Sequence, residues 1–376
     1  MQKLSLSRSA SWLHILSHAS AVLGIVLLLQ GWAPCHSASA QADSTAQLRG
    51  TWTVLPILFS APETGFGIGV LPQYVFRSAP GTRTSNVRLD AYYTQESQFN
   101  VTARTSIWLP GNRHRLRGTV QLREWPTSFY GIGNTFADSL TERYTERSLS
   151  ASGDVHQQLR PGLYAGMGLD ISHRVMQARE PDGQLADGAI AGSIGGQTIG
   201  LGAFLVLDTR DEVFYPTQGT LIRLGSRLYG RMMGADFGFT QHHLDARRYL
   251  RLFGSHVLAL QGMLRLSTGT PPFQMLPGVG EVVRGYPSVR YADRHLLAVQ
   301  AEYRIVPLVW RFGVAVFAGA GQVAPALGDV AWRRFHVAYG AGLRVQIIRS
   351  EGINVRWDFG FGTNSSGDYL DLNEAF

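Results

Sequence analysis

The sequence predicts an all-β protein whose main part is a transmembrane antiparallel β-barrel of about 16 strands. Three observations lead to this prediction. From Thr51 onward, apolar and polar residues alternate over long runs, as in strands with two different faces. After residue 40, no stretch holds the roughly 18 consecutive apolar residues of a spanning helix. The connections between predicted strands alternate between short and long. Because only helices and closed barrels satisfy every backbone polar group in lipid, we expect a barrel.

The alternation is clearest near the C-terminal end of the chain. Between residues 353 and 361, we expect one apolar face made by Ile353, Val355, Trp357, Phe359 and Phe361. Asp358 then lies on the opposite, polar face, and the same rule places Arg344, Glu302 and Arg304 on the polar faces of two earlier strands. The predicted strands begin near residues 52, 64, 84, 97, 112, 141, 163, 197, 218, 235, 254, 295, 311, 332, 351 and 366.

Connections after even-numbered strands are mostly tight, as at 110–112, 160–162 and 349–352. Connections after odd-numbered strands include the three longest, at 126–140, 178–196 and 267–294. This asymmetry is typical of outer-membrane barrels, which have short periplasmic turns and long external loops. Four tryptophans near predicted strand ends together favour interfacial girdles, although core packing is the favoured reading of any one of them alone: Trp52, Trp108, Trp310 and Trp332.

The first forty residues have the order of a secretory signal peptide. Lys3 and Arg8 precede an apolar run over 19–29, and small residues follow at 37–40. We therefore expect residues 1–40 to be removed, 41–51 to form a short periplasmic segment, and 52–376 to form the barrel. An exported barrel belongs in the outer membrane as an integral protein.

Composition excludes several classes of chemistry in the mature chain. Cys35 and Lys3 are the only cysteine and lysine, and both precede the expected cleavage site. Disulfides, thiolate ligands, Schiff bases and a Walker-type lysine are thus not expected. The arginines are scattered along strands, which argues against nucleic acid as a partner. We expect no cofactor, no metal and no enzymatic activity, because His242 and His243 point to opposite faces of one strand and no GxGxxG or GxSxG motif occurs.

Four segments carry a family resemblance: Leu55-Pro56-Ile57 with 60–67, Phe129 to Asn134, Asp208 to Asp211 with Phe214 to Thr220, and Val283-Arg284-Gly285-Tyr286. Together they resemble the BamA/TamA-type outer-membrane protein family, also called the bacterial surface antigen family, over nearly the whole mature chain. The resemblance implies that the loop between strands 11 and 12 folds into the lumen, where carboxylates hold Arg284. Asp358 is the best match for that partner and Glu302 a further candidate. Gly319 stands where many relatives have an acidic residue, and the alternative reading of Arg284 is a solvated loop arginine.

A second group of residues belongs to the predicted periplasmic turn between strands 8 and 9: Asp208, Arg210, Asp211, Tyr215, Pro216 and Gly219. A catalytic carboxylate pair is conceivable here, but a turn organised by local hydrogen bonds is the favoured reading.

The last strand is predicted to run to Phe376 and, with Tyr369, resembles the aromatic-ended strand that barrel assembly machinery recognises. The resemblance implies a weak seam between this strand and the first strand, from Trp52 to Ser60, in which Pro56 removes a backbone donor. The resemblance implies help with outer-membrane protein insertion, or polypeptide translocation. The expected partners are outer-membrane lipids, client outer-membrane proteins and, because family insertases carry periplasmic domains that 41–51 is too short to hold, a periplasmic protein or lipoprotein. The alternatives are a stand-alone pore or scaffold barrel, and the barrel half of a separately encoded surface enzyme system.

Overall fold

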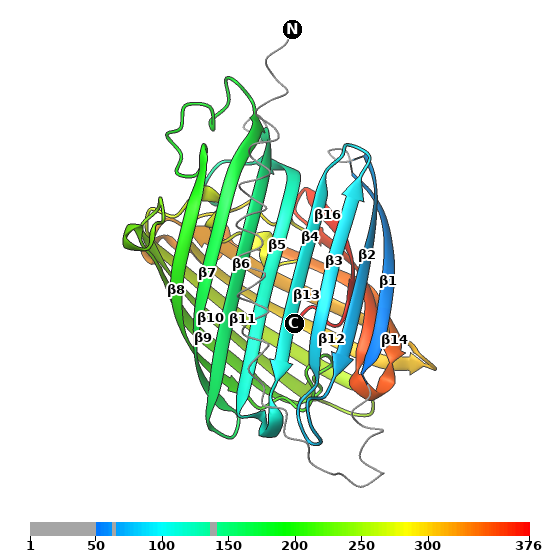
Figure 1. Ribbon diagram of the computed structural model, residues 1–376. Helices are drawn as coiled ribbons and strands as arrows, with labels where there is room; N and C mark the ends of the chain where they lie inside the picture. Colours follow the sequence, from blue (N-terminus) through cyan, green and yellow to red (C-terminus); the bar gives the residue numbers. More distant parts are fainter. Residues whose placement is uncertain (1–49, 62–64, 136–140) are drawn as a thin grey trace.

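The computed structural model describes residues 50–61, 65–135 and 141–376, and its strands form one 16-stranded antiparallel sheet that curls into a barrel (Figure 1). Each strand pairs with the next along the chain, so the predicted number and arrangement of strands are confirmed. The predicted signal peptide, and all but the last two residues of the predicted periplasmic segment, lie outside the described residues. Within the described ranges, no helix is long and apolar enough to cross a membrane.

The strands are β1 (Thr51–Ala61), β2 (Gly65–Phe76), β3 (Ser85–Thr94), β4 (Phe99–Trp108), β5 (His114–Phe129), β6 (Glu142–Arg160), β7 (Leu163–Arg179), β8 (Gly195–Asp208), β9 (Gly219–Tyr229), β10 (Phe239–Arg251), β11 (His256–Gly269), β12 (His295–Val309), β13 (Phe312–Ala324), β14 (His336–Ile348), β15 (Ile353–Gly362) and β16 (Ser365–Leu372). Short 3-10 helices lie in the connections: η2 (Pro110–Asn112), η4 (Arg231–Met233), η5 (Phe273–Met275), η6 (Val279–Glu281), η7 (Leu327–Asp329), η8 (Trp332–Arg334) and η9 (Arg349–Glu351).

The connections differ in length at the two ends of the barrel, as the sequence predicts. Tight connections at 161–162, 252–255 and 310–311 lie at one end, called here the short-turn end. The long connections at 180–194 and 270–294 lie at the other end. β14 begins later than predicted because the residues around Trp332 form the 3-10 helix η8 before the strand starts.

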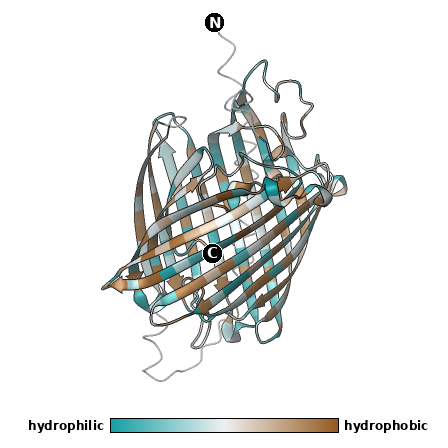
Figure 2. Cartoon of the chain, turned by 180° about the vertical axis from the view of Figure 1, so that it is seen from behind, coloured by the Kyte–Doolittle hydropathy of each residue, from teal (hydrophilic) through white to brown (hydrophobic). Residues whose placement is uncertain are grey.

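The two faces of the wall carry different side chains, and hydrophobic and hydrophilic residues alternate along the strands in Figure 2. On β15, Trp357 and Phe359 are exposed on the outside, whereas Asp358 between them is fully buried. Such alternation suits a wall with lipid on one side and a polar interior on the other. Ile353 departs from the prediction, because it is buried against Val75 and Phe214. The β14–β15 register shifts between Gln346 and Ile348, next to Ile353, and this bulge changes the face that Ile353 presents.

The four tryptophans do not share one environment. Trp52, Trp310 and Trp332 are exposed, which fits the outer surface. Trp108 is 1% exposed and packs edge-on against Tyr164. The guanidinium of Arg115 lies 4.7 Å from its ring centroid. Trp108 is therefore an interior residue, as favoured for any single tryptophan, and it is not part of a girdle.

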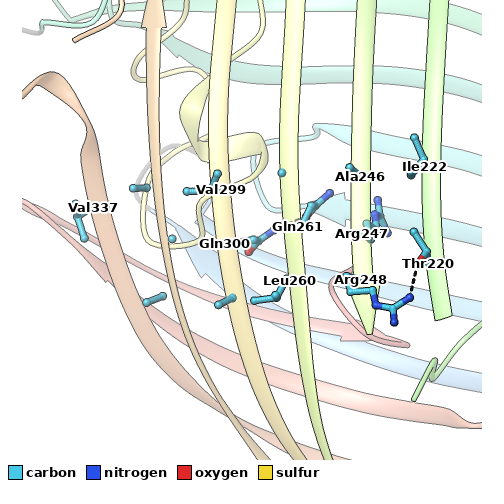
Figure 3. A pocket seen from close by; sticks show the side chains of 15 residues that line it. Thr220, Ile222, Ala246, Arg247, Arg248, Leu260, Gln261, Val299, Gln300 and Val337 are labelled. Carbon is cyan, nitrogen blue, oxygen red and sulfur yellow. Dashed lines mark hydrogen bonds between the residues drawn. The ribbon is translucent and has the colours of Figure 1, made fainter. Parts of the chain in front are cut away.

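The outer wall has a hollow over β9 to β14, with a volume of about 670 Å³ (Figure 3). Small residues such as Ala246, Gly262 and Ala318 form its floor, and the exposed side chains of Leu260 and Val299 border it. Its polar edge is Arg248, whose Nη1 donates to Thr220 Oγ1 at 2.7 Å. An apolar outward face is what a transmembrane barrel presents to lipid.

Candidate functional site

The β11–β12 connection, residues 270–294, carries the motif Val283-Arg284-Gly285-Tyr286 and packs against the inner side of the wall. Val283 and Tyr286 belong to a buried apolar cluster with Leu296 of β12, Val323 of β13 and Ala338 of β14. The Tyr286 hydroxyl donates to the Val337 carbonyl at 2.7 Å. It also accepts from the Thr363 amide at 2.9 Å. These contacts hold the motif in one place on three neighbouring strands.

Arg284 reaches both carboxylates that the resemblance implies. Its Nη1 donates to Asp358 Oδ2 at 2.5 Å, and its Nη2 donates to Glu302 Oε2. The guanidinium carbon lies 3.6 Å from the centroid of the Phe317 ring, which covers its flat face. The Arg284 side chain is 8% exposed, so the structure does not place it as a solvated loop arginine. Gly319 lies against Val283 and Gln300 and contributes no charge.

Glycines make room for the backbone of the motif. Gly285 has φ +116°, a value that other residues rarely adopt. A Cβ added to Gly360 of β15 would lie 2.8 Å from the Gly285 nitrogen and 2.9 Å from the Arg284 carbonyl carbon. A Cβ added to Gly362 would lie 2.5 Å from the Tyr286 ring. The alternate glycines of β15 are therefore the surface on which the loop rests.

Two further buried arginines extend the charge network. Arg344 donates from Nη1 to Asp358 Oδ1 at 2.5 Å and from Nε to Glu374 Oε2 at 2.8 Å. Arg304 donates from Nε to Glu302 Oε1 at 2.6 Å. Both arginines are fully buried, and each carboxylate is shared between guanidiniums. Charges at such depth are stable only when paired, and here they are.

The C-terminal residues leave the wall and join this network. β16 ends at Leu372, so the prediction of a strand running to Phe376 was wrong. Asn373 has φ +68°, and beyond it Glu374 pairs with Arg344. Phe376 is buried beside Tyr249 and Ala259, and its carbonyl oxygen accepts from Arg304 Nη2 at 2.8 Å. The chain turns inward because the buried arginines bind the polar groups of the tail, an attraction that strand alternation does not reveal.

The first and last strands form the two edges of the sheet. β1 pairs with β2 and β16 pairs with β15, and within the described residues no ladder joins β1 to β16. Trp52 is 66% exposed, and Pro56 lies opposite Val70 of β2. The Tyr369 hydroxyl of β16 accepts from the Gly285 amide at 2.8 Å. The last strand is thus bound to the motif loop, while the first strand has one free edge.

Asp371 adds a link from β16 across the interior. It accepts from Arg88 of β3 at 2.5 Å and from Arg356 of β15 at 3.3 Å. Leu372 packs against Ile57 of β1 and Leu71 of β2. Side chains of β16 therefore reach the inner side of β1 to β3, although no backbone ladder is described there.

The β8–β9 connection is organised by local hydrogen bonds, as expected for a structural turn. Arg210 donates from Nε and Nη2 to the two oxygens of Asp208, each at 2.9 Å. Asp211 accepts from the amides of Thr217 and Gln218 at 3.0 and 3.2 Å. Both oxygens of Asp208 are bound by Arg210, and Asp211 is bound by backbone amides. The two carboxylates are therefore engaged in the turn and do not form a catalytic pair. Although burial alone would lower the pKa of Arg210, its bonds to Asp208 raise that pKa above the ordinary value.

The same connection also covers part of the short-turn end. Tyr215 and the neighbouring Pro216 are buried, and Tyr215 packs against Val257 of β11 and Val306 of β12. A Cβ added to Gly219, where φ is +105°, would lie 2.3 Å from the Thr209 carbonyl oxygen. The turn therefore points its aromatic side chains into the barrel, and only glycine fits where it rejoins β9.

Sequence patterns identified Arg284, Asp358 and Glu302. They did not identify Glu374, the contact of the Phe317 ring with Arg284, or the inward arginines of β5 to β10. The inward positions of Arg304 and Arg344 were readable from alternation. The meeting of Glu374 with Arg344 was not, because it depends on the tail leaving the sheet after Leu372.

Comparison with known proteins identifies the family and the fold. The model of the Omp85 superfamily domain matches residues 83–367. BamA from Haemophilus ducreyi lacking POTRA domains 1–3 aligns with a TM-score of 0.53 and 14% identity, over 86% of this chain and 69% of that chain. CdiB from Acinetobacter baumannii aligns with a TM-score of 0.54 and 10% identity, over 86% of this chain and 59% of that chain. None of the curated proteins matches the sequence.

At such low identity the two structures show a shared fold alone. The family match spans most of the chain and confirms the resemblance that the four motifs predict. This chain is an integral outer-membrane β-barrel and belongs to the Omp85 superfamily.

Proposed function

We propose that this barrel assists the insertion of outer-membrane proteins, or the translocation of polypeptide, together with a partner protein. The observation that carries the proposal is the free edge of β1, which pairs on one side with β2 and is not laddered to β16 in the described chain. An unpaired strand edge offers backbone donors and acceptors to an incoming strand. Family membership supports the same activity.

The two edges have unequal roles in this mechanism. β16 is fixed through Tyr369 and Asp371, and its tail is fixed through Glu374. β1 has no comparable ionic anchor among the described residues, and Pro56 interrupts its hydrogen-bonding capacity. Opening of the seam therefore moves β1, because moving β16 and its tail would break the Asp371–Arg88 ion pair and the buried Glu374–Arg344 ion pair.

A partner provides client capture in this proposal. Most of the described chain belongs to the barrel wall and its connections, so a periplasmic protein or lipoprotein is the natural source of a recognition surface. Co-purification from native outer membranes under mild detergent tests this point. A stoichiometric periplasmic protein or lipoprotein is expected, and recovery of the barrel alone would contradict a stable partner.

Reconstitution tests the activity itself. Liposomes containing the barrel and its co-purified partner are expected to accelerate folding of a urea-denatured barrel client, compared with empty liposomes. A photo-crosslinking residue at Val54 of β1 should capture the client. The same residue at Met167 of β7 is the control, because that position is also exposed but lies on a strand paired on both sides. Equal capture at both positions, or no acceleration, would contradict the proposal.

A second candidate is a stand-alone pore or scaffold, which the polar inner wall favours. In planar bilayers, steady conductance without any client folding would support the pore. The inward packing of Tyr215 at the short-turn end argues for low conductance in the resting state.

A further inference from the structure

The inner wall formed by β5 to β10 carries a second set of arginines, on the side away from the Arg284 network. Arg115 and Arg117 lie on β5, Arg223 and Arg227 on β9, and Arg247 on β10. Two of them have carboxylate partners: Arg227 pairs with Asp154 at 3.0 Å, and Arg247 pairs with Asp245 at 2.6 Å. The other three are not matched in this way.

Arg115, Arg117 and Arg223 form no ion pair with any described residue. Arg115 donates to the Ser106 hydroxyl and stacks on Trp108. The Nε of Arg223 is buried without an acceptor among the described residues. Arg223 lines the same small cavity as Arg115 and Arg117.

The carboxylates nearest to these arginines are already engaged. Asp154 lies opposite Arg117 in the β5–β6 ladder, and Arg227 binds it. Asp245 lies opposite Arg223 in the β9–β10 ladder, and it accepts from Arg247 and from Gln261. Each of these carboxylates already balances the charge of the arginine that it binds, so neither supplies a separate negative charge for the three unmatched arginines.

Another polar neighbour of these arginines, His156, carries no negative charge. His156 is 3% exposed, and both of its ring nitrogens lack a partner in the described chain. It borders one small cavity with Arg115, Arg117 and Arg223. A guanidinium keeps its proton at any physiological pH, so three positive charges meet here, and no described carboxylate forms an ion pair with any of them. Enclosing like charges in one place is costly unless an anion joins them.

Space for an anion is present beside them. A cavity of about 560 Å³ is bordered by Arg117, Arg223, Arg227, Arg247 and Arg265, and on its far side by residues 274–277 and 281 of the motif loop. Glu281, the acidic residue on that side, is bound by Arg265 and accepts from the Gly278 amide at 3.0 Å. Cavities between about 300 and 1,000 Å³ are typical of small-molecule sites.

We propose that the lumen binds a polyvalent, phosphate-bearing anion at Arg117 and Arg223, with Arg115 beside them. Arginine forks match the spacing of phosphate oxygens and form paired, charge-assisted hydrogen bonds with them. The site is separate from the β1 edge and from the Arg284 network, so it stands whether or not the barrel inserts client proteins.

Isothermal titration calorimetry of the processed chain in phosphatidylcholine nanodiscs, with inorganic pyrophosphate as the probe, tests the site. Saturable binding to the unaltered protein is expected. The double variant Arg117→Gln with Arg223→Gln should weaken binding by at least about tenfold, which is roughly 1.4 kcal/mol. Arg248→Gln is the matched control, because it removes the same type of charge from the outer wall. Its affinity should stay within about twofold of the unaltered protein.

Two results would overturn the proposal: no saturable binding by the unaltered protein, or equal affinity in the double variant. The first of these results is measured on the unaltered protein, so it does not depend on whether a variant folds. Heat-dependent migration on a gel checks that the variants are folded, and the single substitutions replace the double variant if it is not. Repeating the titration with phosphatidylglycerol in the nanodiscs identifies the natural source of phosphate. Unchanged affinity assigns the site to a soluble anion, and competition assigns it to a lipid headgroup.

Discussion

The two sides of the inner wall use the same residue type in different ways. On β12 to β16, Arg304 and Arg344 share carboxylates with Arg284 in a network in which every guanidinium has a partner. On β5 to β10, Arg117 and Arg223 have none among the described residues. The difference shows that an inward arginine is structural where a carboxylate reaches it, and is available to a ligand where none does.

The largest effect is expected from removing a carboxylate of the matched side. Asp358→Asn keeps the size of the side chain but leaves Arg284, Arg344 and Arg356 short of one negative charge. Breaking a buried ion pair from one side costs about 3–5 kcal/mol. The temperature at which the folded, fast-migrating band disappears on a gel should fall clearly. Asp329→Asn, an exposed position in η7, is the control and should leave that temperature unchanged.

A smaller loss is expected from Arg284→Ala, because Asp358 and Glu302 keep their bonds to Arg344 and Arg304. The barrel should still insert into the outer membrane, with stability reduced by about 2–3 kcal/mol. Arg284→Lys should recover little of this, since an ammonium cannot span both carboxylates as the planar guanidinium does. Unaltered heat resistance in Arg284→Ala would contradict an internal lock.

The smallest of the three effects concerns the glycine surface under the loop. In Gly360→Ala the added methyl group meets the backbone of Arg284 and Gly285, and such overpacking costs about 1–2 kcal/mol. Gly262→Ala is the matched control, because a Cβ there has open space around it. Protease sensitivity of residues 270–294 should rise in the first variant. A similar rise in both variants would mean that the loop does not rest on Gly360.

The sequence predicted the architecture well because period-two alternation and connection lengths are local properties. The sixteen strands follow from them, as does the inward position of Asp358. One error, the predicted outward position of Ile353, came from a local irregularity, the bulge beside it. The inward tail after Leu372 was not predictable, because its partners lie on strands distant in sequence.

The unmatched arginines were also beyond sequence reasoning. Alternation places Arg117 and Arg223 on the inner face, but it does not show which carboxylates reach them. That depends on side-chain directions across neighbouring strands, where Asp154 and Asp245 bind Arg227 and Arg247 instead. Net charge does not reveal such a local excess, since it sums both sides of the barrel.

The most direct test compares one arginine from each side under identical conditions. The midpoint temperature of heat-dependent gel migration is measured for Arg344→Gln and Arg223→Gln in the same detergent and in phosphate-free buffer. Arg344→Gln should lower the midpoint, because it leaves Glu374 and Asp358 short of positive charge. Arg223→Gln should leave the midpoint unchanged or raise it, because it relieves repulsion among neighbouring guanidiniums. Equal loss in both variants would contradict the division of the lumen into a matched and an unmatched side.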